Sequence, residues 1–313
     1  MIWNVKMAKP RQAARVRLPS LKLIPALSVA GAAGVSVWLW RCASRERHRL
    51  LKSGSIQPLQ SAWYFVRGLR IHARIANAHT GNDRDNVVLI HGLGVSSSYF
   101  VPAAECLATQ FAIFAPDLPG HGLSESLSRA LNVQDLAEVA LDWMRVAGLE
   151  RASLVGHSMG CQIAVEMALR NPDRISRLVL IAPTPDPRAR NVAAQLRRFL
   201  LDVFYERPSL TLIVLKDYVR MGTRFVSEFY AMLFHPMEKK LRDVTVPTLL
   251  ARGENDPVVP QRWLEEAALL LGTDGVVVIP RWGHAVQYSA APQLTRAIEP
   301  FLAAHLASGV RQA

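Results

Sequence analysis

The stretch LVGHSMG, residues 154–160, places a serine between two glycines directly after an apolar run. We expect a strand that ends at Ser158, then a sharp turn and a helix that begins near Gly160. Such a turn strains the serine backbone, and it requires Gly156 and Gly160 because side chains there would collide with neighbouring backbone. The turn exposes the hydroxyl to the positive N-terminus of the following helix, which favours a developing anion. The stretch therefore suggests a nucleophilic serine.

Short apolar runs alternate with helical patterns along the chain outside this stretch. An antiparallel pair is predicted over residues 61–76, and buried strands are predicted at 86–92, 111–117, 152–158, 176–184, 247–254 and 275–280. Predicted helices cover 99–109, 133–149, 160–171, 261–271 and 293–307. This alternation is typical of an α/β fold with a doubly wound, mostly parallel sheet and helices on both faces.

One region breaks the alternation. Residues 185–246 contain no predicted strand but many helix formers and large apolar side chains. An insertion of this length between two sheet strands predicts a helical lid rather than a loop. We expect most of its aromatic side chains to form the core of the lid and some to face a ligand.

The N-terminal segment has the composition of a membrane anchor. Residues 23–40, LIPALSVAGAAGVSVWLW, contain no ionisable side chain. A helix of this length reaches about 27 Å, close to the hydrocarbon thickness of a bilayer. Trp38 and Trp40 suit the interface at one end. A single-pass anchor is predicted, with a cleaved signal peptide or a helix packed on the domain as alternatives. Basic residues flank both ends, so the orientation stays open.

These patterns divide the chain into six segments. They are a basic N-terminal segment (1–22), a transmembrane anchor (23–40), a linker (41–60), the first part of the α/β core (61–184), a helical lid (185–246) and the second part of the core (247–313).

The charge is concentrated near the N-terminus. The formal net charge is +12, but residues 1–52 carry eleven Lys or Arg and the single acidic residue Glu46, which leaves +2 for the rest. A nucleic-acid surface should lie on the folded domain, so this class is disfavoured. A basic arm that tethers nucleic acid or anionic lipid remains an alternative.

The three cysteines, Cys42, Cys106 and Cys161, lie far apart. Their spacing supports neither a disulfide framework nor a metal site. Cys161 is expected to be a small core residue, and Cys42, beside the predicted anchor, an ordinary juxtamembrane residue or a lipidated one.

A serine nucleophile needs a base, which in turn needs an orienting carboxylate. His284 follows the predicted strand 275–280 by a short loop, and Asp256 follows the strand before it. The order Ser158, Asp256, His284 is the one found in this type of sheet. A surface role for His284 and a turn-forming role for Asp256 are the alternatives, and Asp186 is a second candidate acid.

Acyl transfer also needs hydrogen-bond donors for the oxyanion. The amide of Met159, directly after the serine, supplies one. The amide of Leu93, in the loop HGLG at 91–94, is expected to supply the other. We expect structural roles for the neighbouring polar residues: bracing of the HGLG loop by His91, loop shaping by Asp117, and packing by His121 and His157.

These motifs together resemble the α/β-hydrolase superfamily, in its lidded lipase, esterase and monoacylglycerol-lipase-like branch. VVLIHGLG, APDLPGHGLS, LVGHSMG, PTLLARGENDPVVP and RWGH occur in the family order over about residues 60–310. The resemblance implies serine hydrolysis through an acyl-enzyme, without a metal or cofactor. Serine at 158 argues against the epoxide hydrolases and haloalkane dehalogenases, which use aspartate there. Cys161 departs from the pattern, since many relatives have glycine at this position.

The sequence therefore predicts a membrane-anchored serine hydrolase that cleaves lipid-like or acyl esters. The triad would be Ser158, Asp256 and His284, with a small-molecule ester as substrate and no nucleic-acid partner. Hydrolysis of a thioester or a carbon–carbon bond by the same triad is one alternative, and a non-enzymatic ligand-binding role is another.

Overall fold

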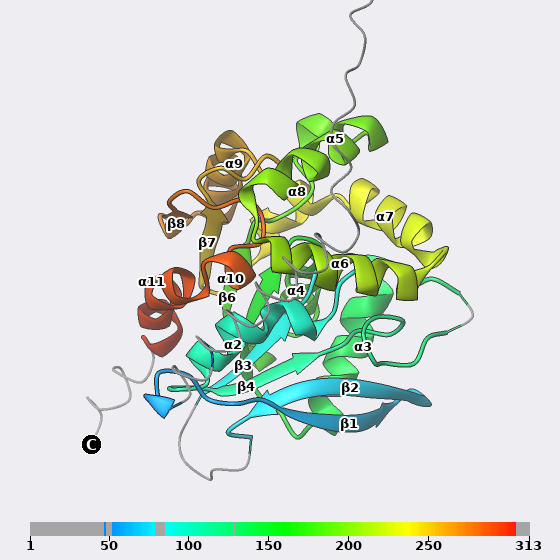
Figure 1. Cartoon of the computed structure of the whole chain (residues 1–313), viewed down its shortest axis with the longest axis vertical. Helices are drawn as coiled ribbons and strands as arrows, with labels where there is room; N and C mark the ends of the chain where they lie inside the picture. The colour runs from blue at the N-terminus through cyan, green and yellow to red at the C-terminus, as the bar shows by residue number, and fades with distance from the viewer. Residues whose placement is uncertain (1–46, 48–51, 79–84, 128, 305–313) are drawn as a thin grey trace, which may run out of the picture.

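The computed structural model describes residues 47, 52–78, 85–127 and 129–304, so the predicted anchor at 23–40 lies outside the described part. Among the residues described, no helix combines the length and hydropathy of a membrane span. A single eight-stranded sheet forms the centre of the molecule, in the order β1-β2-β4-β3-β5-β6-β7-β8 (Figure 1). The strands are β1 Gln60–Val66, β2 Leu69–Ala76, β3 Asn86–Ile90, β4 Ala112–Pro116, β5 Ala152–His157, β6 Ile175–Ile181, β7 Thr248–Gly253 and β8 Val276–Ile279.

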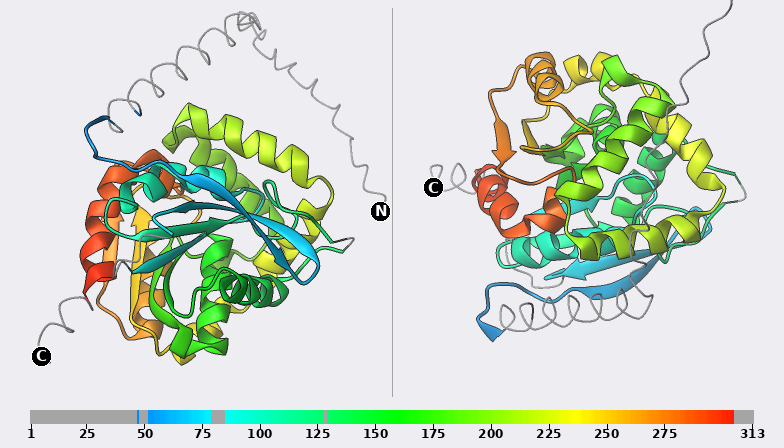
Figure 2. Two further views of the ribbon diagram at one scale, coloured as in Figure 1. Left: turned by 90° about the horizontal axis from the view of Figure 1, so that it is seen from below. Right: turned by 45° about the horizontal axis from the view of Figure 1, so that its top comes forward.

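The predicted mostly parallel sheet is confirmed. β1 pairs with β2 and β2 with β4 in antiparallel fashion, whereas all pairs from β4 to β8 are parallel. The β1–β2 hairpin forms one edge of the sheet, drawn in blue in Figure 2. The central strands are apolar along their whole length because helices cover both of their faces.

Helices flank the sheet as the alternation predicts. α2 packs against α11, and α3 packs against α4, with the two pairs on opposite faces of the sheet (Figure 2). Asn132, of a residue type preferred at this position, caps α3 by accepting the Asp135 amide at 2.7 Å. These and the remaining core helices are α2 Val101–Leu107, α3 Val133–Val146, α4 Met159–Arg170, α9 Gln261–Leu271, α10 Val286–Ser289 and α11 Ala291–Ala303.

A helical insertion separates β6 from β7. It comprises α5 Val192–Asp202, α6 Pro208–Met221, α7 Arg224–Phe234 and α8 Met237–Lys240, with short 3-10 turns before α5, between α5 and α6, and after α8. Figure 1 shows α5, α6 and α7 gathered on one side of the domain. The prediction of helices without a sheet strand is confirmed for this region.

The strand order places a topological switch point beside β3. The chain passes from β3 to β4 on one side and later returns to β5 on the other side. Loops diverge at such a point and leave a crevice at the carboxyl ends of the strands. β3 leads there into the HGLG loop, and β5 leads into Ser158.

Candidate active site

Ser158 occupies a strained turn between β5 and α4. β5 ends at His157, one residue earlier than predicted, and Ser158 has φ +56° and ψ −120°. A Cβ on Gly156 would lie 2.5 Å from the Gly160 carbonyl oxygen, and one on Gly160 would overlap the backbone oxygen of Ile90. Only glycine fits at either position. The turn places the serine at the N-terminus of α4, where the helix dipole stabilises an anion.

Cys161, the departure from the family pattern, packs beneath this turn. Its thiol lies 3.2 Å from the carbonyl oxygens of Gly156 and Ile181. The residue is fully buried, and burial raises the pKa of the thiol well above its usual value. Cys161 is therefore a core residue, as predicted.

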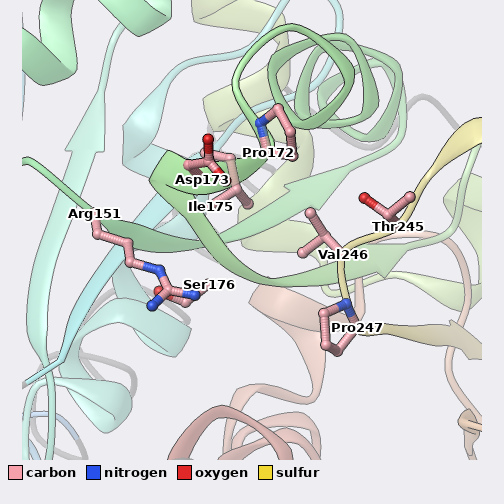
Figure 3. Close-up of a pocket in the computed structure, with 8 residues that line it drawn as sticks. All are labelled: Arg151, Pro172, Asp173, Ile175, Ser176, Thr245, Val246 and Pro247. Carbon is pink, nitrogen blue, oxygen red and sulfur yellow. The ribbon is translucent and has the colours of Figure 1, made fainter.

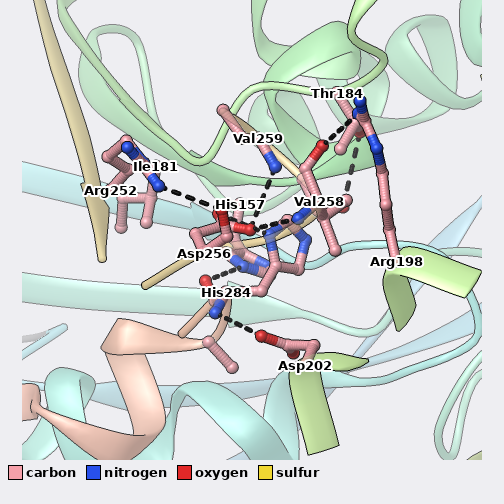
Figure 4. A network of polar contacts seen from close by, with 12 residues as sticks. His157, Ile181, Thr184, Arg198, Asp202, Arg252, Asp256, Val258, Val259 and His284 are labelled. Carbon is pink, nitrogen blue, oxygen red and sulfur yellow. Dashed lines mark hydrogen bonds and ion pairs between the residues drawn. The ribbon is translucent and has the colours of Figure 1, made fainter. Parts of the chain in front are cut away.

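Asp256 and His284 form a buried pair at the carboxyl ends of β7 and β8. Asp256 Oδ2 accepts a hydrogen bond from His284 Nδ1 at 2.9 Å (Figure 4). The other oxygen, Oδ1, accepts the amides of Val258 at 2.7 Å and Val259 at 3.0 Å. With Nδ1 protonated, the Nε2 atom of a neutral imidazole is a proton acceptor. This is the arrangement that a general base requires.

The surroundings of His284 favour its charged form. Burial alone lowers the pKa of the imidazole, but the bonded carboxylate of Asp256, together with Asp202 and Glu206, raises it above the usual histidine value. An imidazolium that formed during proton transfer would therefore be stabilised.

Ser158 directly follows His157, whose ring centroid lies 4.7 Å from that of His284, but no hydrogen bond joins Ser158 to the Asp256–His284 pair. Ser158 Oγ lies 3.4 Å from Thr184 Oγ1. Within the described part of the chain, the buried Nε2 atom of His284 has no hydrogen-bond partner. Hydrogen bonds between catalytic groups are often long in an empty site and shorten when substrate binds.

His157 connects the serine turn to the histidine loop. Its Nε2–H donates to the carbonyl oxygen of His284 at 3.0 Å, and its Nδ1 therefore accepts from the Tyr99 hydroxyl at 2.7 Å. Tyr99 in turn accepts the amide of Gly92 at 2.8 Å. Burial lowers the pKa of His157, which keeps the ring neutral. His157 thus points into packing as predicted, whereas Tyr99 showed no sequence signal beyond its place in a helical pattern.

The two predicted oxyanion donors lie at the switch point. Leu93 follows β3, and Met159 is the first residue of α4. Among the described residues, no protein acceptor is bonded to either amide. His91 braces this loop as predicted, since its Nδ1 donates to the Gly92 oxygen and its Nε2 accepts the Leu118 amide, both at 2.9 Å. Burial lowers the pKa of His91 to about 3, so the ring is neutral.

The second candidate acid, Asp186, lies in a different set of contacts. Its carboxylate pairs with Arg198 at 2.9 Å and with Arg262. Asp256, and not Asp186, bonds the histidine. The loop-shaping role of Asp117 is confirmed, because its side chain accepts the amides of Ser97 at 2.7 Å and Leu123 at 2.9 Å.

A second row of serine, histidine and aspartate occurs at the sheet edge. Ser61 Oγ lies 3.0 Å from His72 Nε2, and His72 Nδ1 lies 2.8 Å from Asp117 Oδ2. Ser61 is inside β1, in register with Arg74, and it does not precede a helix. Three aligned side chains are therefore not sufficient for a site, because acyl transfer also requires a strand-to-helix turn and oxyanion donors.

Two acidic residues of the insertion contact the histidine loop, and the sequence did not single them out. Asp202 Oδ1 accepts the His284 amide at 2.8 Å, and Glu206 Oε1 accepts the Ala285 amide at 2.7 Å. Their four-residue spacing in a helical, otherwise apolar segment was the available signal.

The candidate site is closed in this structure. Ser158 and His284 are each 5% exposed, and the insertion contacts the loops around them. A surface hollow of about 360 Å³ lies elsewhere (Figure 3). It is lined by residues next to the amino ends of β5, β6 and β7, among them Arg151, Ile175 and Val246. Because these strands are parallel, the hollow is at the opposite edge of the sheet from Ser158.

Comparison with known proteins identifies the family of the chain. Residues 87–298 match the Alpha/beta hydrolase family. The chain belongs to the α/β-hydrolase family. The mostly parallel eight-stranded sheet of this α/β hydrolase is the fold that the sequence motifs predict.

The relatives of this α/β hydrolase include esterases. It is 29% identical over 234 residues to the pimeloyl-[acyl-carrier protein] methyl ester esterase of Nitrosomonas europaea, covering 66% of this chain and 90% of the relative. A solved membrane phospholipase A described as a bacterial virulence factor superposes with a TM-score of 0.70 at 23% identity, covering 92% of this chain and 97% of the other. A thermophilic esterase from Thermogutta terrifontis superposes with a TM-score of 0.66 at 21% identity, covering 78% and 98%. These two structures share the fold.

Proposed function

We propose that this protein is a serine hydrolase of carboxylic esters. Ser158 is the nucleophile, His284 the general base and acid, and Asp256 the residue that orients the imidazole. The observation that carries the proposal is the buried Asp256–His284 hydrogen bond, with an unpaired Nε2, beside a serine in a strained turn at a helix N-terminus. The esterases among the relatives support the same reaction class.

The reaction proceeds in two halves. Ser158 Oγ rotates toward His284, transfers its proton to Nε2 and forms a bond to the ester carbonyl carbon. The amides of Leu93 and Met159 bind the resulting oxyanion, the ester C–O bond breaks, and the alcohol leaves with the proton from Nε2. Water then attacks the acyl-enzyme with His284 again as base, and the acid departs from a regenerated serine.

We further propose that the helical insertion, residues 185–246, is a lid over this site. From α5 to α7, the charges on the outer surface of this insertion have one sign. The carboxylates of this stretch are buried or half-buried, at positions 202, 206, 217 and 228. The exposed charged side chains of the same stretch are all cationic: Arg197, Arg207, Lys216 and Arg220. Large apolar side chains are exposed between them: Leu196, Leu200, Phe204, Leu212, Leu215, Val219, Val226, Tyr230 and Phe234. An apolar surface with only positive charges suits a face that meets anionic lipid. Lipid-like esters are therefore the proposed substrates.

The proposed location is a membrane, through residues 23–40 as a single-pass anchor. The uncharged run of this segment and its terminal tryptophans support it. Carbonate washing should leave the full-length protein with membranes. Its release into the soluble fraction would reject a spanning anchor and favour the cleaved signal peptide.

A fluorophosphonate probe tests the nucleophile. We expect labelling of the full-length protein and complete loss of labelling in Ser158→Ala. Ser61→Ala is the matched control, because Ser61 also belongs to a serine–histidine–aspartate row, and it should label at the wild-type rate. Labelling that persists in Ser158→Ala, or is lost in Ser61→Ala, would overturn the assignment.

A substrate panel tests the bond that is cleaved. p-Nitrophenyl esters of increasing acyl length, acyl-thioesters and vinylogous diketones should be compared on the same preparation. We expect esters to be hydrolysed fastest, with a preference for longer acyl chains. A preference for the thioester or the diketone would favour the corresponding alternative, and no turnover of any substrate would favour a binding role.

A further inference from the structure

The segment from α5 to Glu206 turns its charged side toward the protein and leaves large apolar side chains exposed. Arg198, Asp202 and Glu206 recur every fourth residue and are half-buried against the loops below. Leu200 and Phe204, on the other side, are 61% and 83% exposed. Residues four apart lie on one face of a helix. A surface helix ordinarily buries its apolar face, so this charged face has another role.

The charged face contacts both loops that carry the Asp256–His284 pair. Asp202 accepts the amide of His284 at 2.8 Å, and Arg198 donates to the Val258 carbonyl at 3.0 Å (Figure 4). Val258 is the residue whose own amide holds Asp256. One turn of the insertion therefore contacts the main chain of the acid loop and that of the base loop.

Glu206 extends these contacts along the histidine loop. One of its oxygens accepts the Ala285 amide at 2.7 Å, and the other accepts the hydroxyl of Ser289. Gly283 lies so close that a Cβ there would be 2.5 Å from Asp202 Oδ1 and 2.9 Å from Glu206 Oε1. Together these contacts determine where the main chain at 283–289 lies relative to the insertion.

This arrangement is unfavourable for the two carboxylates. The pKa of Asp202 is raised to about 6, mainly by burial. The neighbouring His284 lowers this pKa and Asp256 raises it. Burial and then Asp202 raise the pKa of Glu206 to about 7, with Ser289, Ala285 and His284 opposing. Three acidic groups surround one histidine here. Ionised groups that cost folding free energy and cluster at a cleft mark functional sites more often than structural ones.

We propose that Asp202 and Glu206 are positioning residues that seat the His284 loop for proton transfer, so that the insertion and the base move together. The proposal rests on the proposed function. Both carboxylates bond the main chain around His284, and their negative charge stabilises the imidazolium that forms when Ser158 loses its proton. If the segment from α5 to Glu206 moved away, the His284 loop would lose these hydrogen bonds. His284 would then no longer be held in position to act as the base.

The test compares Asp202→Asn and Glu206→Gln with wild type in the full-length, detergent-solubilised protein. Each amide keeps an oxygen that accepts the backbone N–H, so these variants remove charge and retain the hydrogen bond. Glu228→Gln is the control, because Glu228 is another buried carboxylate of the same insertion but faces His121. The readouts are kcat and KM for a p-nitrophenyl ester from pH 5 to 9, and the melting temperature at pH 8.

We expect the acidic limb of kcat/KM to move to lower pH in both variants, since a carboxylate that raises the pKa of His284 has been removed. We also expect kcat to fall by about 10- to 100-fold while KM changes little. The melting temperature at pH 8 should rise, because a raised carboxyl pKa means stability that is lost as pH rises through that pKa. Glu228→Gln should leave the acidic limb in place.

A purely structural role predicts a different result. In that case activity and melting temperature fall together, and the acidic limb stays where it is, which would overturn the proposal. The proposal also fails if Glu228→Gln moves the limb as far as the two test variants. If either variant does not fold, the charge-keeping variants Asp202→Glu and Glu206→Asp take its place. These should fold and retain the wild-type acidic limb of kcat/KM. A shifted limb in a charge-keeping variant would also overturn the proposal. Absence of turnover in wild type would reject the proposed function itself.

Discussion

The imidazole of His157 donates a hydrogen bond to the carbonyl oxygen of His284 at 3.0 Å, across 127 residues of sequence. His157 directly precedes the candidate nucleophile, so this bond fixes the histidine loop against the serine turn. The Tyr99 hydroxyl extends the connection to the Gly92 amide beside the candidate oxyanion donor. The three loops of the site are therefore joined by neutral, buried groups whose hydrogen-bond directions are determined.

Tyr99→Phe should disconnect these loops. The change leaves the Gly92 amide and His157 Nδ1 buried without their present partner, which costs about 1–3 kcal/mol. We expect a lower melting temperature and a fall in kcat of about tenfold, because the Leu93 amide follows Gly92 and is less well held. Thermal unfolding and ester hydrolysis measure the two effects. Unchanged kcat with a lower melting temperature would limit the connection to stability.

Asp256→Asn should abolish most of the activity and leave the fold intact. An amide does not hold the imidazole in the tautomer that accepts at Nε2, and the loss in kcat for such a change is about 10⁴-fold. Asp186→Asn, at the other candidate acid, should lose less than about tenfold, because Asp186 pairs with arginines. Steady-state kinetics on both variants decide between them. A larger loss in Asp186→Asn would reverse the assignment.

Glu166 should make folding stability depend on acid pH. Its buried carboxylate pairs with His235 at 2.7 Å, Lys240 at 3.0 Å and Arg170. Burial raises the pKa of Glu166, but these hydrogen bonds outweigh it and lower the pKa to about 2. A lowered carboxyl pKa gives stability that is present above pH 4.5 and is lost as pH falls toward 2. α4 and the end of the insertion should therefore separate in acid.

Glu166→Gln tests this pH dependence. At pH 7 we expect a loss of about 3 kcal/mol in the free energy of unfolding, and the difference from wild type should shrink between pH 4.5 and pH 2. Glu138→Gln is the control, since its carboxylate is 47% exposed and should contribute under about 0.5 kcal/mol. Urea unfolding at several pH values gives the numbers. A difference that does not vary with pH would contradict the linkage.

Gly160→Ala should damage the serine turn. The added Cβ overlaps the Ile90 carbonyl, so the N-terminus of α4 must move away from Ser158. We expect fluorophosphonate labelling to slow by about 100-fold. Gly148→Ala is the control: it has φ +74° with open space around it, so it should cost about 1 kcal/mol of stability and label at the wild-type rate. Equal labelling rates for all three proteins would exclude a packing requirement at Gly160.

Local patterns in the sequence were sufficient to predict the strands and most of the helices of the fold. Gly156 and Gly160 mark the serine turn because two close backbone approaches leave no room for a Cβ. Asp256 and His284 were assigned because residues that follow successive parallel strands meet at one edge of a sheet. These are short-range or topological constraints, and they leave a trace in residue type and spacing.

Contacts between distant segments were decided only by the tertiary structure. The sequence contains no mark that joins Tyr99 to His157, or that aims Asp202 and Glu206 at the backbone of the histidine loop. Nor does it show that Ser61 aligns with His72 and Asp117. The physical reason is that a hydrogen bond to a main-chain group or a buried partner depends on where the segments pack. That packing is a property of the whole chain and not of the few residues that make the bond.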